Sequence, residues 1–332
     1  MILSSQKENG AEITLWSLAA KKLLEEQKQT WQLLKNNYEA LPNVLYRNLS
    51  INDQIITLQN NPARIFSTLA DVSNSGINSR PCFLCLNNLP QEQKALEYGK
   101  HYLILCNPYP IFEEHFTIVH KKHIPQNIIN NFDDFLDITQ KLGFGYSLFY
   151  NGPKCGASAP DHLHFQAAKK GIIPIENELD QIKNWNDKNI ISTNKIEITF
   201  IENYLRYGFL IESGNKAELI DAFKIFIRAF KNISSPDEEP MMNIISLFSD
   251  ETWQIIIFPR KKHRPSHYFE KDNKKIIVSP AAVDMGGMFI LPRSEDYNKI
   301  NEKDILDIYN QVTITKEFFE YLKKKIVDSF NK

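Results

Sequence analysis

Two histidines and a glutamine alternate along one short stretch of the chain, and these side chains are the ones best suited to chemistry. The stretch covers residues 155–166 and reads C-G-A-S-A-P-D-H-L-H-F-Q. Because alternate side chains of a strand share a face, we expect His162, His164 and Gln166 to point the same way. The small residues at 156–158 let backbone N–H groups approach an anion. The pattern indicates an anion-binding loop beside two imidazoles; the alternative is a solvent-facing strand that carries two histidines by chance.

A second chemical feature is the C-x-x-C pair formed by Cys82 and Cys85. Its spacing is that of half a tetrahedral zinc site, and two more ligands, most simply histidines, would complete it. A redox dithiol is the alternative, but no βαβ pattern surrounds the pair. Four cysteines in 332 residues do not make a disulfide scaffold. We therefore predict a structural zinc site.

The overall charge is nearly balanced, with 39 Lys and Arg against 40 Asp and Glu. This balance gives no argument for a nucleic-acid or membrane partner, so any positive charge that binds phosphate must be local. No apolar run approaches the roughly 20 residues that span a bilayer. The first residues lack the basic start and apolar core of a signal peptide. We therefore expect a cytoplasmic protein.

The elements that position these residues can be outlined from hydrophobic periodicity. Apolar residues at helical spacing predict amphipathic helices over residues 15–41 and 128–142. Short apolar runs bounded by Asn, Pro and Gly predict strands at 54–59, 102–106, 116–119, 146–150 and 162–168.

The second half of the chain follows a related order. Strands are expected at 242–248 and 253–258, as a hairpin, and at 287–291. The basic segment 259–263 follows its strand much as His120 to His123 follow theirs. This weak repeat predicts an α+β fold of two units, each an antiparallel sheet flanked by helices. The predicted boundaries are an N-terminal helical segment at 1–45, a catalytic half at 46–190 and a second half at 191–332.

The motif resembles that of a known family. Gly-Ala-Ser followed by His-x-His-x-Gln is similar to the signature of the histidine-triad (HIT-like) superfamily, in its transferase branch. That branch contains galactose-1-phosphate uridylyltransferase, diadenosine tetraphosphate phosphorylase and GDP-L-galactose phosphorylase, and the hydrolase relatives carry a third histidine where this chain has Gln166. The order of Asn107, His123 and Asn151, and Ser279 with the Gly-Gly pair at 286–287, also resembles the family.

The resemblance implies two HIT-like units and a double-displacement reaction. His164 would attack the α-phosphorus of a nucleoside diphosphate ester, and a phosphate or sugar phosphate would then take the nucleotidyl group. Gln166 would hydrogen-bond a non-bridging oxygen. The resemblance to zinc-bearing uridylyltransferases implies His123 and His162 as the remaining zinc ligands. His120, His115 and His101 lie near in the sequence and are alternatives to His123. Such relatives can complete their sites across a dimer, so a homodimer is compatible with the resemblance.

Six residues are candidates for binding the substrate: Arg64, Asn107, Asn151, Gly156, Ser158 and Arg260. Arginine suits phosphate because its planar fork matches two oxygens, although a surface arginine after a turn is the alternative for Arg64. Asparagine is also common at strand ends for turn reasons alone.

The resulting hypothesis is a nucleotidyltransferase or phosphorylase that uses a nucleoside diphosphate sugar or a dinucleoside polyphosphate. One departure from the uridylyltransferase pattern is Leu163, where those enzymes have proline. Two alternatives stay open: a nucleotide hydrolase of the same fold, and a non-catalytic nucleotide-binding module.

Overall fold

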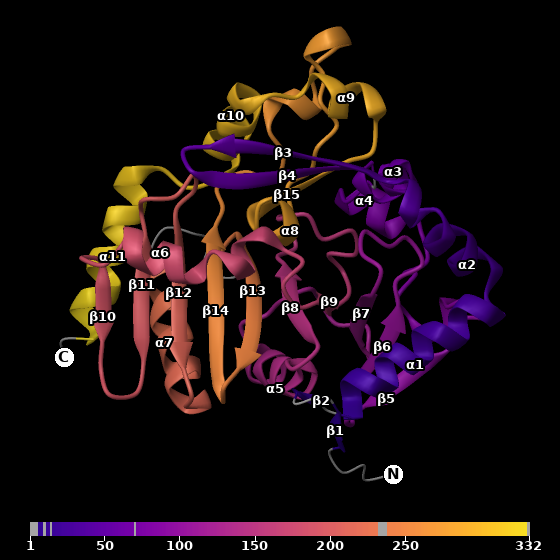
Figure 1. The fold of residues 1–332 in the computed structure, drawn as a ribbon, viewed down its shortest axis with the longest axis horizontal. Coiled ribbons are helices and arrows are strands. Elements are labelled where there is room, and N and C mark those ends of the chain that lie inside the picture. The colour runs from indigo at the N-terminus through magenta and orange to yellow at the C-terminus, as the bar shows by residue number, and fades with distance from the viewer. Residues whose placement is uncertain (1–5, 9–10, 14, 70, 232–237, 331–332) are drawn as a thin grey trace.

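The fold is organised around one large antiparallel sheet to which both halves of the chain contribute (Figure 1). The computed structural model describes residues 6–8, 11–13, 15–69, 71–231 and 238–330. No helix among these residues is long and apolar enough to cross a membrane.

The large sheet has ten strands, all paired with antiparallel neighbours. They are β5 (Ala95–Tyr98), β6 (Tyr102–Cys106), β7 (His115–His120), β8 (Tyr146–Asn151), β9 (His164–Lys169), β10 (Ile190–Ser192), β11 (Glu197–Ile201), β12 (Gly208–Ser213), β13 (Met242–Ser249) and β14 (Thr252–Pro259). Their order across the sheet is β10-β11-β12-β14-β13-β8-β9-β7-β6-β5.

The two halves of this sheet have the same topology, which confirms the predicted repeat. Counted from each edge toward the middle, the strand order is β5-β6-β7-β9-β8 in one half and β10-β11-β12-β14-β13 in the other. Each half also inserts a helix after its third strand, α5 (Phe132–Leu142) in the first and α7 (Lys216–Lys231) in the second. One predicted correspondence is wrong: β14 takes the place of β9, not of β7, so the basic segment at 259–263 is not the counterpart of His120 to His123.

The halves meet where β8 pairs with β13, with Asn151 opposite Asn243. The predicted hairpin of β13 and β14 is confirmed, since Ser249 pairs with Thr252 across its turn.

The two faces of the sheet are covered differently. Helices pack on one face, where Phe165 of β9 lies in a buried apolar cluster with Phe135 of α5 and Phe226 of α7. Burying a side chain of this size contributes about 1.5–3 kcal/mol, so this layer supplies much of the stability. The other face is covered by a small sheet and short helices, whose apolar residues form a second cluster with Phe149 and Phe258.

The small sheet joins distant parts of the chain. It contains β3 (Leu45–Ile51), β4 (Gln54–Asn60) and β15 (Met288–Leu291) in the order β15-β4-β3. The pairing of β15 with β4 is parallel, with Leu291 opposite Asn60. The predicted strand at 287–291 is thus confirmed, but it pairs with the first half of the chain instead of extending the large sheet.

The remaining elements complete the layers. A separate two-stranded sheet contains β1 (Gln6–Glu8) and β2 (Ala11–Ile13). The other helices are α1 (Leu15–Thr30), α2 (Gln32–Glu39), α3 (Ile65–Thr68), α4 (Asn74–Asn78), α6 (Leu179–Trp185), α8 (Ala282–Met285), α9 (Ser294–Lys299), α10 (Glu302–Val312) and α11 (Lys316–Phe330).

Three predicted elements have different bounds in the structure. The helix at 15–41 is broken at Trp31, whose backbone is extended with φ −127° and ψ 103°. The helix at 128–142 begins only at Phe132, because Asn127 Oδ1 accepts the N–H of Ile129 and forms a turn. The strand at 162–168 begins at His164, because the N–H of His162 is bonded in a turn to the carbonyl of Ala159.

Candidate active site

His164 lines a cavity of about 410 Å³. Its Nδ1 lies 2.8 Å from the carbonyl oxygen of His162. Because a carbonyl oxygen can only accept, Nδ1 carries the ring proton and Nε2 carries the lone pair. Burial lowers the pKa of His164 to about 4, so the ring is neutral at pH 7. No hydrogen bond within the described residues uses Nε2, which is therefore the nitrogen available for attack.

The backbone of His164 is held by the buried side chain of Gln126. Gln126 Oε1 accepts the N–H of His164 at 2.8 Å, and Gln126 Nε2 donates to the carbonyls of His164 at 3.0 Å and Asn151 at 2.9 Å. These bonds tie the start of β9 to the end of β8. Gln126 was not predicted from the sequence, since no motif marks it.

Gln166 shares the cavity with His164, and its amide is oriented by a buried histidine. Gln166 Oε1 lies 2.8 Å from Nε2 of His115. Because an amide oxygen only accepts, His115 donates through Nε2, and the amide nitrogen of Gln166 remains as its donor. Burial lowers the pKa of His115 to about 3, with the nearby charge of Arg64 adding to the effect. His115 is therefore neutral and fixes which end of the Gln166 amide acts as the donor.

The predicted alternation holds for His164 and Gln166 but fails for His162. His164 and Gln166 line the cavity, while Leu163 and Phe165 are buried in the helical layer. His162 precedes the strand, and its Nδ1 lies 3.3 Å from Sγ of Cys82.

The loop before β9 requires a glycine at 156. Gly156 has φ +93°, and a Cβ added there would lie 2.6 Å from the Cβ of Ala281. Any larger residue would therefore be strained and would clash with the second half of the chain. Ser158 lines the cavity in the same loop, and its carbonyl accepts from Nη2 of Arg80 at 3.2 Å.

The two predicted asparagines line the cavity, but each also has a local structural bond. Asn151 Oδ1 accepts the N–H of Ala282 at 2.7 Å and Nδ2 of Asn243 at 3.0 Å, so Asn151 joins the two halves. Asn107 Oδ1 accepts the N–H of Tyr109 at 3.0 Å, which is the turn role considered from the sequence.

The two predicted arginines have different positions. Arg64 lines the cavity, and its Nη1 donates to the carbonyl of Tyr109 at 2.8 Å. Burial lowers the pKa of Arg64 to about 10, which still leaves it charged at pH 7. Arg260 does not line the cavity.

The guanidinium of Arg260 is buried and engaged by the chain. It donates to the side-chain oxygen of Asn243 and to the carbonyls of Pro280, Val312, Lys262 and His263. The prediction of a substrate contact is therefore replaced by a structural role: Arg260 holds two loops of the second half together.

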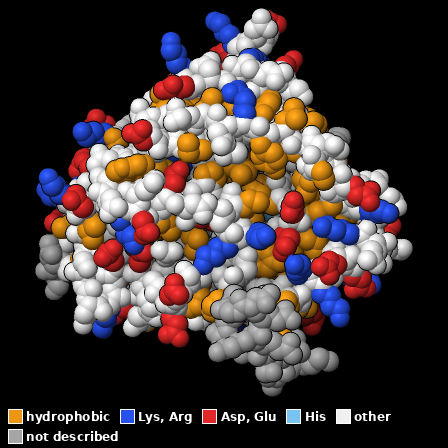
Figure 2. All heavy atoms as spheres, viewed as in Figure 1, with side chains coloured by type: hydrophobic (Ala, Val, Ile, Leu, Met, Phe, Trp, Pro, Cys, Tyr) orange, Lys and Arg blue, Asp and Glu red, His pale blue; other side chains and the backbone are white. Residues whose placement is uncertain are grey.

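One wall of the cavity comes from the second half of the chain. Four polar residues of this half line the same cavity as His164, namely His263, Arg264, Ser279 and Asp284. His263 was noted from the sequence in a basic segment, and Ser279 through the family resemblance, but no pattern predicted that these side chains form this wall. Apolar side chains also line the cavity, including Trp31, Phe83 and Leu84. Figure 2 shows apolar side chains gathered in the middle of the face that Figure 1 presents.

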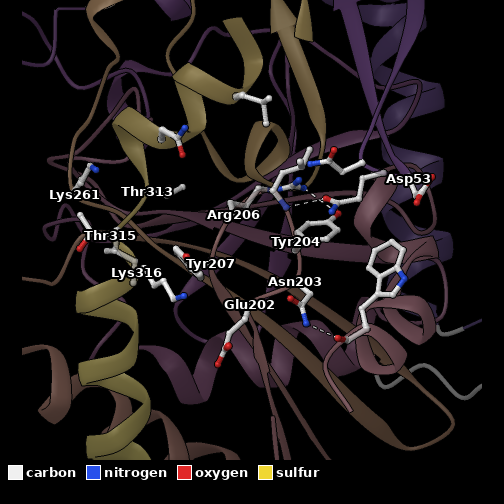
Figure 3. Close-up of a pocket in the computed structure, with 17 residues that line it drawn as sticks. Asp53, Glu202, Asn203, Tyr204, Arg206, Tyr207, Lys261, Thr313, Thr315 and Lys316 are labelled. Carbon is white, nitrogen blue, oxygen red and sulfur yellow. Dashed lines mark hydrogen bonds between the residues drawn. The ribbon is translucent and has the colours of Figure 1, made fainter. Parts of the chain in front are cut away.

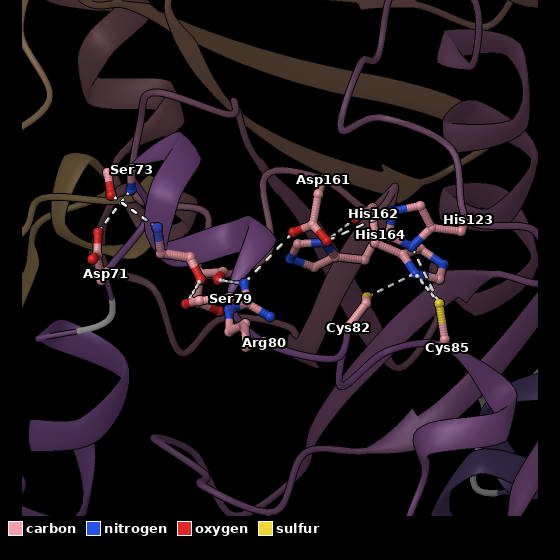
Figure 4. A network of polar contacts seen from close by, with 12 residues as sticks. Asp71, Ser73, Ser79, Arg80, Cys82, Cys85, His123, Asp161, His162 and His164 are labelled. Carbon is pink, nitrogen blue, oxygen red and sulfur yellow. Dashed lines mark hydrogen bonds and ion pairs between the residues drawn. The ribbon is translucent and has the colours of Figure 1, made fainter.

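Two cysteines and two histidines form a compact cluster close to His164 (Figure 4). The ligand atoms of Cys82, Cys85, His123 and His162 all lie within 4.8 Å of one another. Sγ of Cys85 is 3.2 Å from Nδ1 of His123 and 3.6 Å from Nδ1 of His162. Nε2 of His162 bonds to the carbonyl of His120 at 2.7 Å and so carries the proton, which leaves Nδ1 as a ligand. Two sulfurs and two imidazoles could hold a metal ion.

The residues around this cluster support its geometry. Asp161 lies 3.7 Å from Nε2 of His123 and 3.5 Å from Nη2 of Arg80 (Figure 4). A carboxylate on the far nitrogen of a ligand histidine orients the ring. Of the competing histidines, His115 bonds to Gln166, and Nδ1 of His120 is paired with the backbone of Lys122. The structure thus brings His123 to the cysteines.

Comparison with known proteins finds two matching domain families and a related phosphorylase sequence. Residues 23–169 match the family model for a domain of unknown function (DUF4922), and residues 180–332 match that for the GDPGP1-like C-terminal domain. A sequence relative, GDP-L-galactose phosphorylase 2 of Arabidopsis thaliana, is 29% identical over 189 residues, which are 55% of this chain and 40% of the relative. The chain therefore aligns with less than half of that relative.

Solved structures show the same fold over most of the chain. Yeast Ap4A phosphorylase Apa2 in complex with AMP matches with a TM-score of 0.57 and 16% identity, covering 87% of this chain and 94% of that one. The same enzyme in complex with Ap4A matches with a TM-score of 0.57 and 15% identity, covering 88% and 96%. The chain thus shares the fold of this phosphorylase, a mixed fold of antiparallel sheets flanked by helices.

The chain has a second, more open cleft, of about 810 Å³, away from His164 (Figure 3). It lies between the β3–β4 turn, the segment before β12 and the start of α11, and Tyr204, Arg206 and Lys316 are among its lining residues. Arg206 is buried there against the rings of Tyr204 and Tyr309. None of the residues predicted for the active site lines this cleft.

Proposed function

We propose that this protein transfers a nucleoside monophosphate from a nucleoside diphosphate sugar, or from a dinucleoside polyphosphate, to phosphate or a sugar phosphate. The transfer proceeds through a covalent nucleotidyl group on His164. The observation that carries the proposal is the hydrogen bond from Nδ1 of His164 to the carbonyl of His162, which leaves an unprotonated Nε2 on a ring that lines the cavity.

In the first step, Nε2 of His164 attacks the α-phosphorus of the donor. A P–N bond forms, the bond from phosphorus to the bridging oxygen breaks, and the leaving phosphate ester takes the electron pair. Positive charge then develops on the ring, and the carbonyl of His162 stabilises it through the Nδ1–H bond. In the second step an oxygen of the acceptor attacks the same phosphorus, and the P–N bond breaks to restore neutral His164.

Two features of the cavity would stabilise negative charge on the non-bridging oxygens of the phosphoryl group. The amide nitrogen of Gln166 is the donor that the bond to His115 leaves for a non-bridging oxygen. Arg64 supplies a positive charge in the same cavity. Gln166 has no titratable proton to offer a leaving group or a water, which supports transfer over hydrolysis.

The donor set of Cys82, Cys85, His123 and His162 fits a zinc ion held for structure, since two thiolates and two imidazoles with close ligand atoms suit tetrahedral zinc. Zinc would link the loop of the cysteines to His162, whose carbonyl orients His164. Its contribution would be structural, because all four positions are filled by the protein.

The substrate class follows from the similar proteins. Proteins with this fold or a related sequence are named as phosphorylases of GDP-L-galactose and of Ap4A, whose donors share a phosphoric anhydride next to a nucleoside. We therefore propose an anhydride-linked nucleotide as the donor, with inorganic phosphate as the first acceptor to test.

The test is a product analysis with and without phosphate. The protein is incubated with single nucleoside diphosphate sugars or dinucleoside polyphosphates, and the products are separated by chromatography. We expect phosphate to be required and the nucleotide to appear as its diphosphate. Release of the monophosphate at the same rate without phosphate would instead identify a hydrolase, and binding of donors without turnover would identify a binding module.

A further inference from the structure

Three polar side chains of the second half are coupled to one another on the cavity wall. His263 and Arg264 follow β14, and Ser279 precedes α8. Ser279 Oγ accepts from Nε of Arg264 at 3.1 Å and lies 3.4 Å from Nε2 of His263. Because arginine can only donate, the Ser279 hydroxyl keeps its own proton for His263 or for a ligand.

This group of three is held in place from behind by Arg260. The buried guanidinium of Arg260 donates to the carbonyl of Pro280 at 2.9 Å and to that of His263 at 3.2 Å. It thereby fixes the segment that directly follows Ser279 and the segment that carries His263 and Arg264. Contacts that fix a group before a ligand arrives reduce the entropy lost on binding.

The group also lies next to the loop that leads to the nucleophile. Ala281, two residues after Ser279, packs so closely against Gly156 that a Cβ there would lie 2.6 Å away. Ser158 and His164 line the same cavity as His263, Arg264 and Ser279. One cavity therefore carries the nucleophile on one half of the chain and this group on the other.

The charges of the group suit an anion. Arg264 is positive, and the pKa of His263 is lowered to about 4 by burial and by the charges of Arg264 and Arg260. The carboxylate that lines the same cavity, Asp284, is used by the chain, since it accepts the N–H groups of Ala281 and Ile290. Arg264 has the carboxylate of Asp71 nearby, and a bound anion would be a second negative partner on the cavity side.

We propose that His263, Arg264 and Ser279 form a subsite for the second phosphoryl group: first the β-phosphoryl of the donor, and then the acceptor phosphate that replaces it. This inference rests on the proposed function. In an in-line displacement the leaving oxygen departs on the side of phosphorus opposite the nucleophile. The group at that side must be bound by residues outside the His164 strand, and these three share the cavity from the other half.

The experiment uses a donor that lacks the second phosphoryl group. A nucleoside 5′-phosphorimidazolidate can nucleotidylate His164 with imidazole as the leaving group, so it does not need the subsite. Intact mass follows labelling by this reagent, and then loss of the label when inorganic phosphate is added. The variants are Ser279→Ala and His263→Asn. The matched controls are Ser266→Ala and His267→Asn, which alter the same segment outside the cavity.

We expect labelling by the imidazolidate to match that of the wild type in all four variants. Discharge by phosphate should fall about tenfold to a hundredfold in Ser279→Ala and His263→Asn, the effect of losing a hydrogen bond to a charged group. Discharge in the two controls should equal that of the wild type. Labelling and discharge that fall by the same factor would indicate a general structural role and would overturn the proposal, as would unchanged discharge.

Failure of the proposed function gives a different result. If the imidazolidate and the natural donors both fail to label the wild-type protein, the covalent mechanism is wrong. Calorimetry with inorganic phosphate then decides on the subsite alone. Weaker binding in Ser279→Ala but not in Ser266→Ala would support it, and equal affinity in both would overturn it.

Discussion

Replacing His115 by phenylalanine tests whether the orientation of Gln166 matters for the reaction. The substitution keeps an aromatic ring at a fully buried position beside Phe112 and Phe149, so packing is largely retained. It removes the donor that lies 2.8 Å from Gln166 Oε1. The amide can then rotate and present its oxygen to the phosphoryl group.

The magnitude follows from one lost hydrogen bond. Leaving a buried acceptor without its donor costs about 1–3 kcal/mol. If the free energy of the transition state rises by this amount, the rate of nucleotidylation falls by about fivefold to a hundred-and-fifty-fold. Rapid mixing with donor and quenching at successive times, followed by intact mass, measures that rate at saturating donor.

A rescue and a control separate orientation from packing. His115→Gln places an amide N–H near the former Nε2, so it should recover part of the rate, whereas His101→Asn changes an exposed histidine outside the cavity and should have no effect. A His115→Phe protein that is nucleotidylated at the wild-type rate would refute the reasoning, because the amide would then need no fixed donor.

Three further predictions concern stability and the metal. The pKa values of His164 and His115 are lowered to about 4 and about 3, so the unfolded chain binds more protons than the folded chain below about pH 6.5. The free energy of unfolding, measured with denaturant, should therefore fall as the pH drops from about 6.5 toward 4, by up to about 1.4 kcal/mol per pH unit for each histidine. A free energy of unfolding that does not change over this pH range would contradict the burial of these rings. Gly156→Ala should lower the melting temperature and the activity. Gly99→Ala, where nothing lies within 4 Å of an added Cβ, should lower the melting temperature much less. Equal decreases in the two variants would show that the contact with Ala281 is unimportant. Elemental analysis should find about one zinc per chain, lost with stability in His123→Asn but retained in His120→Asn, and the reverse result would reassign the ligand.

The sequence was most informative where residues close in the chain act together. The C-x-x-C pair and the H-x-H-x-Q motif are local patterns, and the structure brings their residues into two adjacent clusters. Strand periodicity predicted the shared direction of His164 and Gln166. The same periodicity failed for His162, because a turn ends there and rotates its side chain toward Cys82.

The residues that escaped prediction act through long-range contacts. Gln126 and His115 reach β9 from loops and strands 38 and 51 residues away, and no local pattern marks such bonds. The cavity wall of His263 and Ser279 lies opposite His164 because the halves pack together and β15 pairs with β4. Arg260 is of a residue type that often binds phosphate. Only the structure shows that it is buried and that its N–H groups donate to the chain itself.

The most direct test of the central claim is to map the covalent group. The wild-type protein is mixed with a donor in the absence of acceptor, its intact mass is measured, and the labelled peptide is sequenced by mass spectrometry. We predict a gain equal to one nucleoside monophosphate less water, located on His164, absent in His164→Ala and removed by added phosphate. Turnover of the donor by a His164→Ala protein, or a label on any other residue, would contradict the account.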